Sequence, residues 1–105
     1  MILIETTSNS KKVLDNISKK LLNKKLTACI HMIEMDSNYL WKDTLVKEKE
    51  YKISIKTVEK NKGKISKLIK RNHNYDIYEL SIKKIQNLNS EYLEWFKKEI
   101  TSNGI

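Results

Sequence analysis

Cys29 and His31 are the first residues of this chain whose types and spacing suggest shared chemistry, because they stand two positions apart in a stretch with strand-like alternation. Side chains two apart on a strand project to the same face. A thiolate and an imidazole on one face form a soft ligand pair that suits Cu(I), Cu(II) or Zn(II). A lone cysteine between apolar neighbours is also typical of a small buried hydrophobic residue, so both interpretations stay open.

His73 is a second candidate metal ligand, because it follows a lysine-rich helical pattern and begins a polar tract. A histidine at the end of a helix is also favoured by the helix dipole alone, so a structural role is the alternative. Met32 and Met35 would add thioether ligands, but apolar positions on a strand are typical of core or interface methionines.

Three polar and aromatic tracts fall near the ends of expected strands, where a small sheet protein can gather polar groups without burying them alone. The tracts are Ser37 to Trp41, Glu50 to Thr57 and His73 to Glu79. The chain contains no catalytic triad, glycine-rich phosphate loop or His-Glu-x-x-His pattern. These observations favour a binding protein over an enzyme.

The periodicity of apolar residues predicts the elements that position these tracts. A short strand over residues 1–6 and a capping cluster precede a helix with apolar residues at three-to-four spacing, Val13, Leu14, Ile17 and Leu21. A long antiparallel hairpin is predicted next. Side chains alternate between apolar and polar from Leu26 to Trp41, a turn follows at residues 42–44, and the alternation resumes through Thr57.

The second half of the chain repeats the helix and strand signals. Apolar positions predict a second helix that contains Ile65, Leu68 and Ile69 and ends at residues 72–74. A fourth strand is predicted from Ile77, Leu80, Ile82 and Ile85. A last helix that covers the open sheet is predicted from Tyr92, Leu93, Trp95, Phe96 and Ile100. Residues 1–105 are therefore expected to form a single α+β domain of ferredoxin-like βαββαβ topology with a C-terminal helix.

The length of the hairpin predicts more than a monomer. A strand from Leu26 to Leu40 would reach about 50 Å at about 3.3 Å per residue, whereas a compact domain of this size is only about 35 Å across. The overhanging part would expose unpaired backbone and apolar side chains that another copy of the chain could cover. The alternative is a bend or break at residues 34–38.

Composition limits the possible partners. The formal net charge of +8 is compatible with nucleic-acid binding, but Arg71 is the only arginine among 21 basic residues, and phosphate and base recognition relies heavily on arginine. The single cysteine cannot form an internal disulfide. The absence of long apolar runs and of a signal-peptide pattern predicts a cytoplasmic protein with no membrane partner.

The ordered tracts resemble the CutA family of divalent-cation tolerance proteins over nearly the whole chain. Ala28-Cys29-Ile30 is similar to the family's Ala-Cys-Val, Ser37-x-Tyr39-x-Trp41 to its Ser-x-Tyr-x-Trp, and Glu50 to Thr57 to its Glu-x-x-x-x-x-Lys-Thr. The tract from His73 to Glu79 is similar to His-Pro-Tyr-Glu-x-Pro-Glu, and Glu91 to Trp95 to Asp-Tyr-Leu-x-Trp. Asn74 and Tyr78 replace the family prolines, and Asp43 replaces the glycine of the hairpin turn, changes that should loosen turns without altering the fold.

The resemblance implies a homotrimer whose long hairpins join edge to edge, with a role in tolerance of divalent cations such as copper and no organic cofactor. It places Cys29 and His73 among the candidate metal ligands, together with Glu5, which stands where some relatives carry a cysteine and would favour harder ions. It also implies a polar and aromatic cluster near the subunit interface, made of Tyr39, Trp41, Lys56, Tyr75 and Glu79. This cluster would hold a small anionic ligand or form an interfacial salt bridge.

Three other functions would each require particular residues of the sequence. A structural or signalling trimer with a PII-like small-ligand role would use the same cluster. An RNA-binding module on a ferredoxin-like sheet needs exposed stacking aromatics on the third strand, where only Tyr51 is present. An acylphosphatase-like hydrolase needs an arginine in the first loop, and residues 7–12 contain none. Nucleic acid is therefore not an expected partner.

Overall fold

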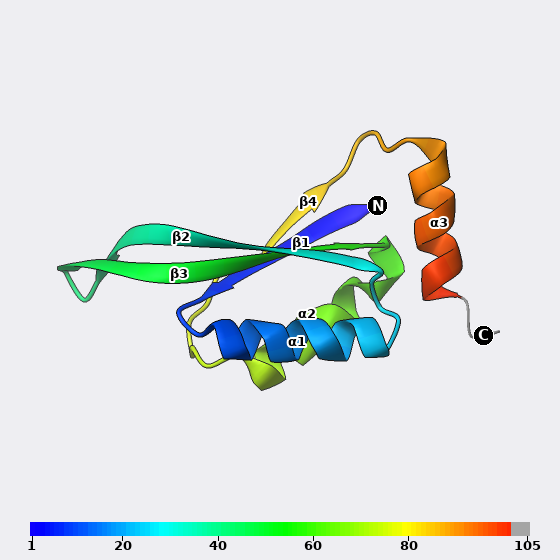
Figure 1. The fold of residues 1–105 in the computed structure, drawn as a ribbon. Coiled ribbons are helices and arrows are strands. Elements are labelled where there is room, and N and C mark those ends of the chain that lie inside the picture. Colours follow the sequence, from blue (N-terminus) through cyan, green and yellow to red (C-terminus); the bar gives the residue numbers. More distant parts are fainter. Residues whose placement is uncertain (102–105) are drawn as a thin grey trace.

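The computed structural model describes residues 1–101, whose strands and helices alternate in the predicted order (Figure 1). The elements are β1 (Ile2–Ser8), α1 (Lys11–Asn23), β2 (Cys29–Trp41), β3 (Thr44–Thr57), the short 3-10 helix η1 (Glu59–Asn61), α2 (Lys62–Asn72), β4 (Ser81–Lys84) and α3 (Ser90–Ile100). The strands pair antiparallel in one sheet of order β2-β3-β1-β4. This arrangement confirms the ferredoxin-like α+β fold.

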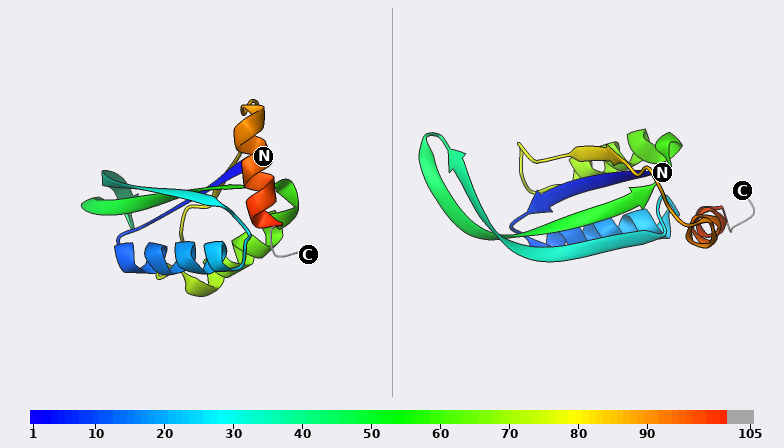
Figure 2. Two further views of the ribbon diagram at one scale, coloured as in Figure 1. Left: turned by 45° about the vertical axis from the view of Figure 1, so that its right-hand side comes forward. Right: turned by 90° about the horizontal axis from the view of Figure 1, so that it is seen from above.

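Helices α1 and α2 lie side by side on one face of the sheet and leave the other face open (Figures 1 and 2). The core lies between these helices and alternate residues of β1 and β3, since strand side chains alternate between faces. Its buried members include the two apolar sets that the periodicity predicts, Leu14, Ile17 and Leu21 of α1 and Ile65, Leu68 and Ile69 of α2. Ser10 caps α1 by accepting a hydrogen bond from the backbone of Val13 (3.2 Å).

The hairpin of β2 and β3 is unbroken. Its pairing runs in a constant register from Cys29 opposite Lys56 to Trp41 opposite Thr44, so the alternative of a break at residues 34–38 is wrong. The turn consists of Lys42 and Asp43, whose φ angles of 49° and 64° are those of a tight type I′ connection that matches the twist of the strands. Aspartate tolerates this left-handed region at modest cost, which explains how the turn forms without glycine.

The hairpin extends well beyond the core. Strand β1 pairs with only residues 51–57 of β3, so the half of the hairpin nearest the turn has no third strand beside it (Figure 2). The molecule measures 49 × 27 × 20 Å with a radius of gyration of 14.9 Å, compared with about 13 Å for a compact chain of this length. The predicted overhang is confirmed.

Two strand boundaries differ from the prediction. Strand β2 begins at Cys29 instead of Leu26, because the carbonyl of Leu26 accepts hydrogen bonds from the side chains of Thr57 (2.7 Å) and Asn61 (3.1 Å) instead of joining the ladder. The fourth strand spans only Ser81–Lys84, and Ile77 is 75% exposed. Ile77 and Leu80 therefore lie in the loop before β4, which His73 and Asn74 fasten to the end of β1.

The prediction that the last helix covers the open sheet is wrong. Helix α3 stands beside the end of the sheet near the start of β2 (Figures 1 and 2). Phe96 is fully buried there, while Trp95 remains 45% exposed. None of the helices within residues 1–101 is both long and apolar enough to cross a membrane.

Candidate functional site

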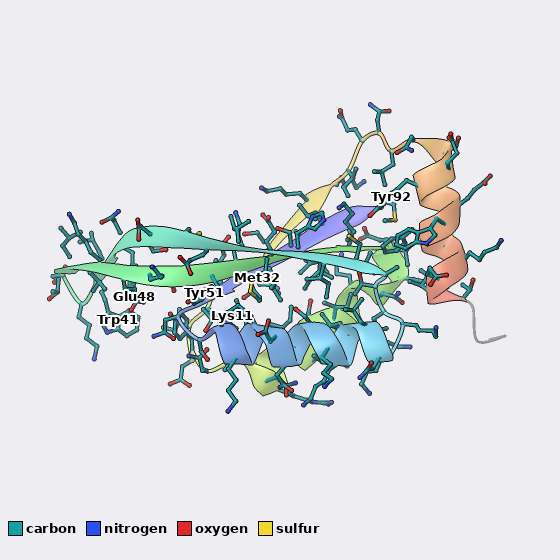
Figure 3. The ribbon with its side chains drawn as sticks, viewed as in Figure 1. Lys11, Met32, Trp41, Glu48, Tyr51 and Tyr92 are labelled. Carbon is teal, nitrogen blue, oxygen red and sulfur yellow. The ribbon has the colours of Figure 1, made fainter. Side chains whose placement is uncertain are left out.

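A cleft of about 910 Å³ lies between the overhanging half of the hairpin and the loop after α2. Four of the five residues predicted to form the polar and aromatic cluster line it, Tyr39, Trp41, Tyr75 and Glu79. Trp41 and Glu48 lie on this part of the hairpin in Figure 3. Lys56, the fifth predicted residue, is not among the cleft's lining residues.

Two tyrosines and two glutamates form a hydrogen-bonded cluster at the cleft. The Tyr75 hydroxyl donates to Glu50 Oε2 (2.7 Å) and accepts from the backbone N–H of Asn9 (2.9 Å). The Tyr39 hydroxyl donates to Glu48 Oε1 (2.6 Å), which also lies 3.4 Å from the Tyr75 hydroxyl. Glu50 is only 6% exposed, so Tyr75 supplies a hydrogen bond that little water could replace.

The surroundings of both phenols raise their pKa values and keep them protonated. The hydrogen bond to Glu48 raises the pKa of Tyr39 to about 12. Burial, followed by the hydrogen bond to Glu50, raises the pKa of Tyr75 well above its usual range. At neutral pH both hydroxyls are therefore donors, and they hold the carboxylates of Glu48 and Glu50 in place beside the cleft.

The residues that replace the family prolines fasten the loop through side-chain contacts. Asn74 accepts a hydrogen bond from the Ser8 hydroxyl (2.6 Å) and donates to the Asn9 side chain (3.0 Å). The Tyr78 ring stacks on His73 at 4.5 Å between centroids and an 11° interplanar angle. These contacts order the loop beside Tyr75 without the rigidity of proline.

His73 is held by backbone groups on both sides of its ring. Its Nε2 donates to the carbonyl of Thr7 (2.9 Å), and its Nδ1 accepts from the backbone N–H of Tyr75 (3.0 Å). Burial lowers the pKa of His73, which keeps the imidazole neutral in this arrangement. Metal binding by His73 would require one of these two hydrogen bonds to break.

Cys29, His31 and Lys56 lie at the other end of the hairpin, beside α3. Cys29 Sγ and His31 Nε2 are 3.6 Å apart, which confirms that the two side chains share a face. The Lys56 ammonium lies 5.6 Å from the centre of the Tyr92 ring, a cation–π distance. Burial, then a hydrogen bond with Cys29, raises the pKa of Tyr92 to about 12.

Glu5 lies on the open face of the sheet within a ring of donors. It accepts a hydrogen bond from the Ser54 hydroxyl (2.7 Å) and pairs with Lys83 (3.3 Å) and Lys52 (3.8 Å). The Ser54 hydrogen bond and both lysines lower the pKa of Glu5, although its burial acts in the opposite direction. Its charge is thus already balanced within the chain.

The three residues predicted as metal ligands occupy separate surroundings. Within residues 1–101 there is no group of three or more histidine, cysteine, aspartate or glutamate side chains arranged to hold a metal ion. Cys29 and His31 form the one predicted donor pair that the fold brings together. A typical four-ligand zinc site would need further donors from outside the chain.

Sequence reasoning missed Glu48 and gave Glu50 no role of its own. The signal was present, because the two-residue turn fixes the pairing and places Ser37 opposite Glu48 and Met35 opposite Glu50. Both glutamates therefore share the face of Tyr39, two to four residues from it along the sheet.

The fold and the cleft define a ferredoxin-like protein with an overhanging hairpin and an acidic, aromatic site at its free end. Residues 2–99 match the family model described as CutA1 divalent ion tolerance protein, and the chain belongs to this family. It is 33% identical to the divalent-cation tolerance protein CutA of Thermotoga maritima over 95% of this chain and 99% of that protein.

Solved structures agree with this assignment. The crystal structure of CutA1 from Pyrococcus horikoshii superposes with a TM-score of 0.89 at 27% identity and covers 94% of this chain and 97% of that one. CutA1 from Oryza sativa gives a TM-score of 0.87 at 28% identity over 93% of this chain and 91% of that one. The fold of this chain is therefore that of the CutA1 structures.

Proposed function

We propose that this protein is a homotrimeric, non-enzymatic binding protein that takes up divalent cations, copper foremost, or a small ligand whose binding depends on them, in clefts between subunits in the cytoplasm. The observation that carries the proposal is the cleft itself. Its predicted residues meet where the loop after α2, with Tyr75 and Glu79, faces the part of the hairpin, with Tyr39 and Trp41, that overhangs the core of its own chain. Because the cleft lies beside the overhanging hairpin, a second chain that packs against the hairpin can supply one of the walls of the cleft.

Exposed apolar side chains support association at the hairpin. Leu40 is 73% exposed, Leu45 63% and Ile77 75%. Leu40 and Ile77 line the cleft, and Leu45 lies opposite Leu40 across the strands. Strand β2 is also the edge of the sheet, with unpaired backbone groups along one side. Burial of this edge by sister chains would cover both features at once.

The charge of the cleft and the ligand types at the other end of the hairpin both suit cations. Glu50, Asp76 and Glu79 line the cleft and no lysine or arginine does, so the cleft of one chain suits a cation better than the anion expected from the resemblance. At the far end, the 3.6 Å between Cys29 Sγ and His31 Nε2 fits a shared ion, because such ligands on a tetrahedral ion lie about 3.5 Å apart. The pair would supply soft donors, and a sister chain or water would supply the rest.

Light scattering and copper titration test the two parts separately. The wild type should have a mass near three times 12.4 kDa, about 37 kDa. Titration with Cu(II), and with Cu(I) under reducing conditions, should give heat with wild type and lose most of it in Cys29→Ala and His31→Ala. His73→Gln is the matched control, because His73 is already bonded to backbone groups and its loss should leave the titration unchanged.

Each part has its own contradicting result. A folded protein of 12.4 kDa at micromolar concentration would contradict the trimer. Identical titration curves for wild type, Cys29→Ala and His31→Ala would remove the soft pair as the copper site. Loss of binding in His73→Gln alone would move the site to the loop after α2.

A further inference from the structure

A second concave surface lies on the helical layer, away from the open face of the sheet. It is a groove of about 730 Å³ between α1 and α2, which we call the basic groove. Its lining residues are Lys20, Lys24, Leu26, Lys64, Lys67, Leu68, Arg71 and Asn72. Five of these eight carry positive charge and none carries negative charge, so the groove concentrates a large share of the chain's net charge of +8.

The charges in the basic groove are not neutralised by the protein. Lys20 Nζ donates to the neutral Asn72 side chain (2.8 Å), and within residues 1–101 no carboxylate pairs with any of the five cations. Two lysines elsewhere on the same helices are paired, Lys11 with Asp15 (3.0 Å) and Lys62 with Glu59 (2.9 Å). Like charges gathered in a concave surface repel one another and strengthen the local field, which favours an anion at that place.

The lining chemistry points to phosphate groups. Lysine ammonium groups bind phosphate as point charges, and the guanidinium of Arg71 can bind two phosphate oxygens at once. Leu26 and Leu68 supply apolar surface, and no aromatic side chain lines the groove to stack on a nucleobase. The volume of about 730 Å³ is that of a small-molecule site, about 300–1,000 Å³.

We propose that the basic groove binds a compact polyphosphorylated small molecule through Lys20, Lys24, Lys64, Lys67 and Arg71. Several closely spaced phosphates would neutralise cations on both helices together, which one isolated phosphate cannot do. The groove lies on the helical layer, whereas the proposed subunit contacts use the hairpin and the edge of β2, so assembly would leave it accessible (Figure 1). The proposal does not depend on metal binding.

Calorimetric titration with inorganic tripolyphosphate in metal-free buffer tests this, since metal-free conditions prevent chelation from contributing heat. The groove variant is Lys24→Gln, Lys67→Gln and Arg71→Gln combined, three exposed positions whose replacement leaves the core intact. The matched control removes the same charge elsewhere, with Lys12→Gln, Lys47→Gln and Lys97→Gln combined. Circular dichroism verifies that both variants fold.

The groove variant should bind tripolyphosphate at least about tenfold more weakly than wild type, whereas the control should stay within about threefold. Amide shifts on adding tripolyphosphate should map to α1 and α2, and orthophosphate should bind more weakly than tripolyphosphate. No binding by wild type, or equal losses in both variants, would overturn the proposal. Groove-dependent binding of a single-stranded RNA oligonucleotide that is tighter than binding of tripolyphosphate would overturn it in favour of a nucleic-acid surface.

Discussion

Tyr75→Phe is expected to destabilise the protein by removing one hydroxyl from the cleft. That hydroxyl donates to Glu50, which is only 6% exposed, across 2.7 Å. A hydrogen bond to a charged group contributes about 1.5–3 kcal/mol, and the loss is greatest where water cannot replace the donor. Because the Tyr75 ring is itself partly exposed, the lower end applies, and the free energy of unfolding should fall by about 1.5 kcal/mol.

Urea unfolding followed by circular dichroism measures this loss. All samples need one protein concentration, because the stability of an oligomer depends on it. Tyr39→Phe is the matched control, since it removes a comparable hydrogen bond (2.6 Å) from Glu48, a carboxylate that is more exposed than Glu50. The loss in Tyr75→Phe should be more than twice that in Tyr39→Phe. Equal losses would refute the reasoning that the burial of Glu50 makes the bond to Tyr75 important.

Three further predictions concern pH and assembly. The pKa of Glu5 lies below 4.5 in the folded state, so its contribution to the free energy of unfolding is present above pH 4.5 and disappears as the pH falls through the lower folded pKa. In Glu5→Gln, the urea concentration at the unfolding midpoint should therefore change less with pH in this acid range. The pKa of His73 lies below 6.5 because of burial, so stability is full above pH 6.5 and declines as the pH falls below it. His73→Gln should remove that decline, and an unchanged pH profile would contradict the assignment. Leu45→Glu places a charge on the exposed hairpin and should shift the mass measured by light scattering from about 37 kDa toward 12.4 kDa, whereas Lys47→Gln should not.

The hairpin shows what this sequence could predict. Alternation predicts which face of the sheet each side chain occupies and how far the hairpin extends. The register comes from the two-residue turn at Lys42 and Asp43, which is one residue shorter than the turn predicted over residues 42–44. The predicted length of the hairpin exceeds the diameter of a compact domain of this size, so the overhang follows from the two lengths alone. The cluster itself was implied by the resemblance to the CutA family, and the structure places four of its five members in the cleft.

Features decided by long-range packing were not predictable from the same signals. The amphipathic pattern of α3 shows that Phe96 needs a partner, but not which surface supplies it, and the helix packs beside the end of the sheet. Ile77 fits a strand pattern, yet hydrogen bonds of neighbouring His73 and Asn74 to the end of β1 set the course of its loop. The cytoplasmic location and the roles of the metal candidates stay predictions.

The position of Lys56 bears on whether the two ends of the hairpin meet between subunits. Lys56 and Glu50 are six residues apart on one extended strand, a separation of about 20 Å at about 3.3 Å per residue. Within one chain, Lys56 therefore cannot reach Glu50 at the cleft, and a Lys56 side chain could come there only from a sister chain. If hairpins join so that one chain's Lys56 meets another chain's cleft, Lys56→Gln should weaken the trimer; if Lys56 only packs on Tyr92, the mass should stay unchanged while the melting temperature falls slightly.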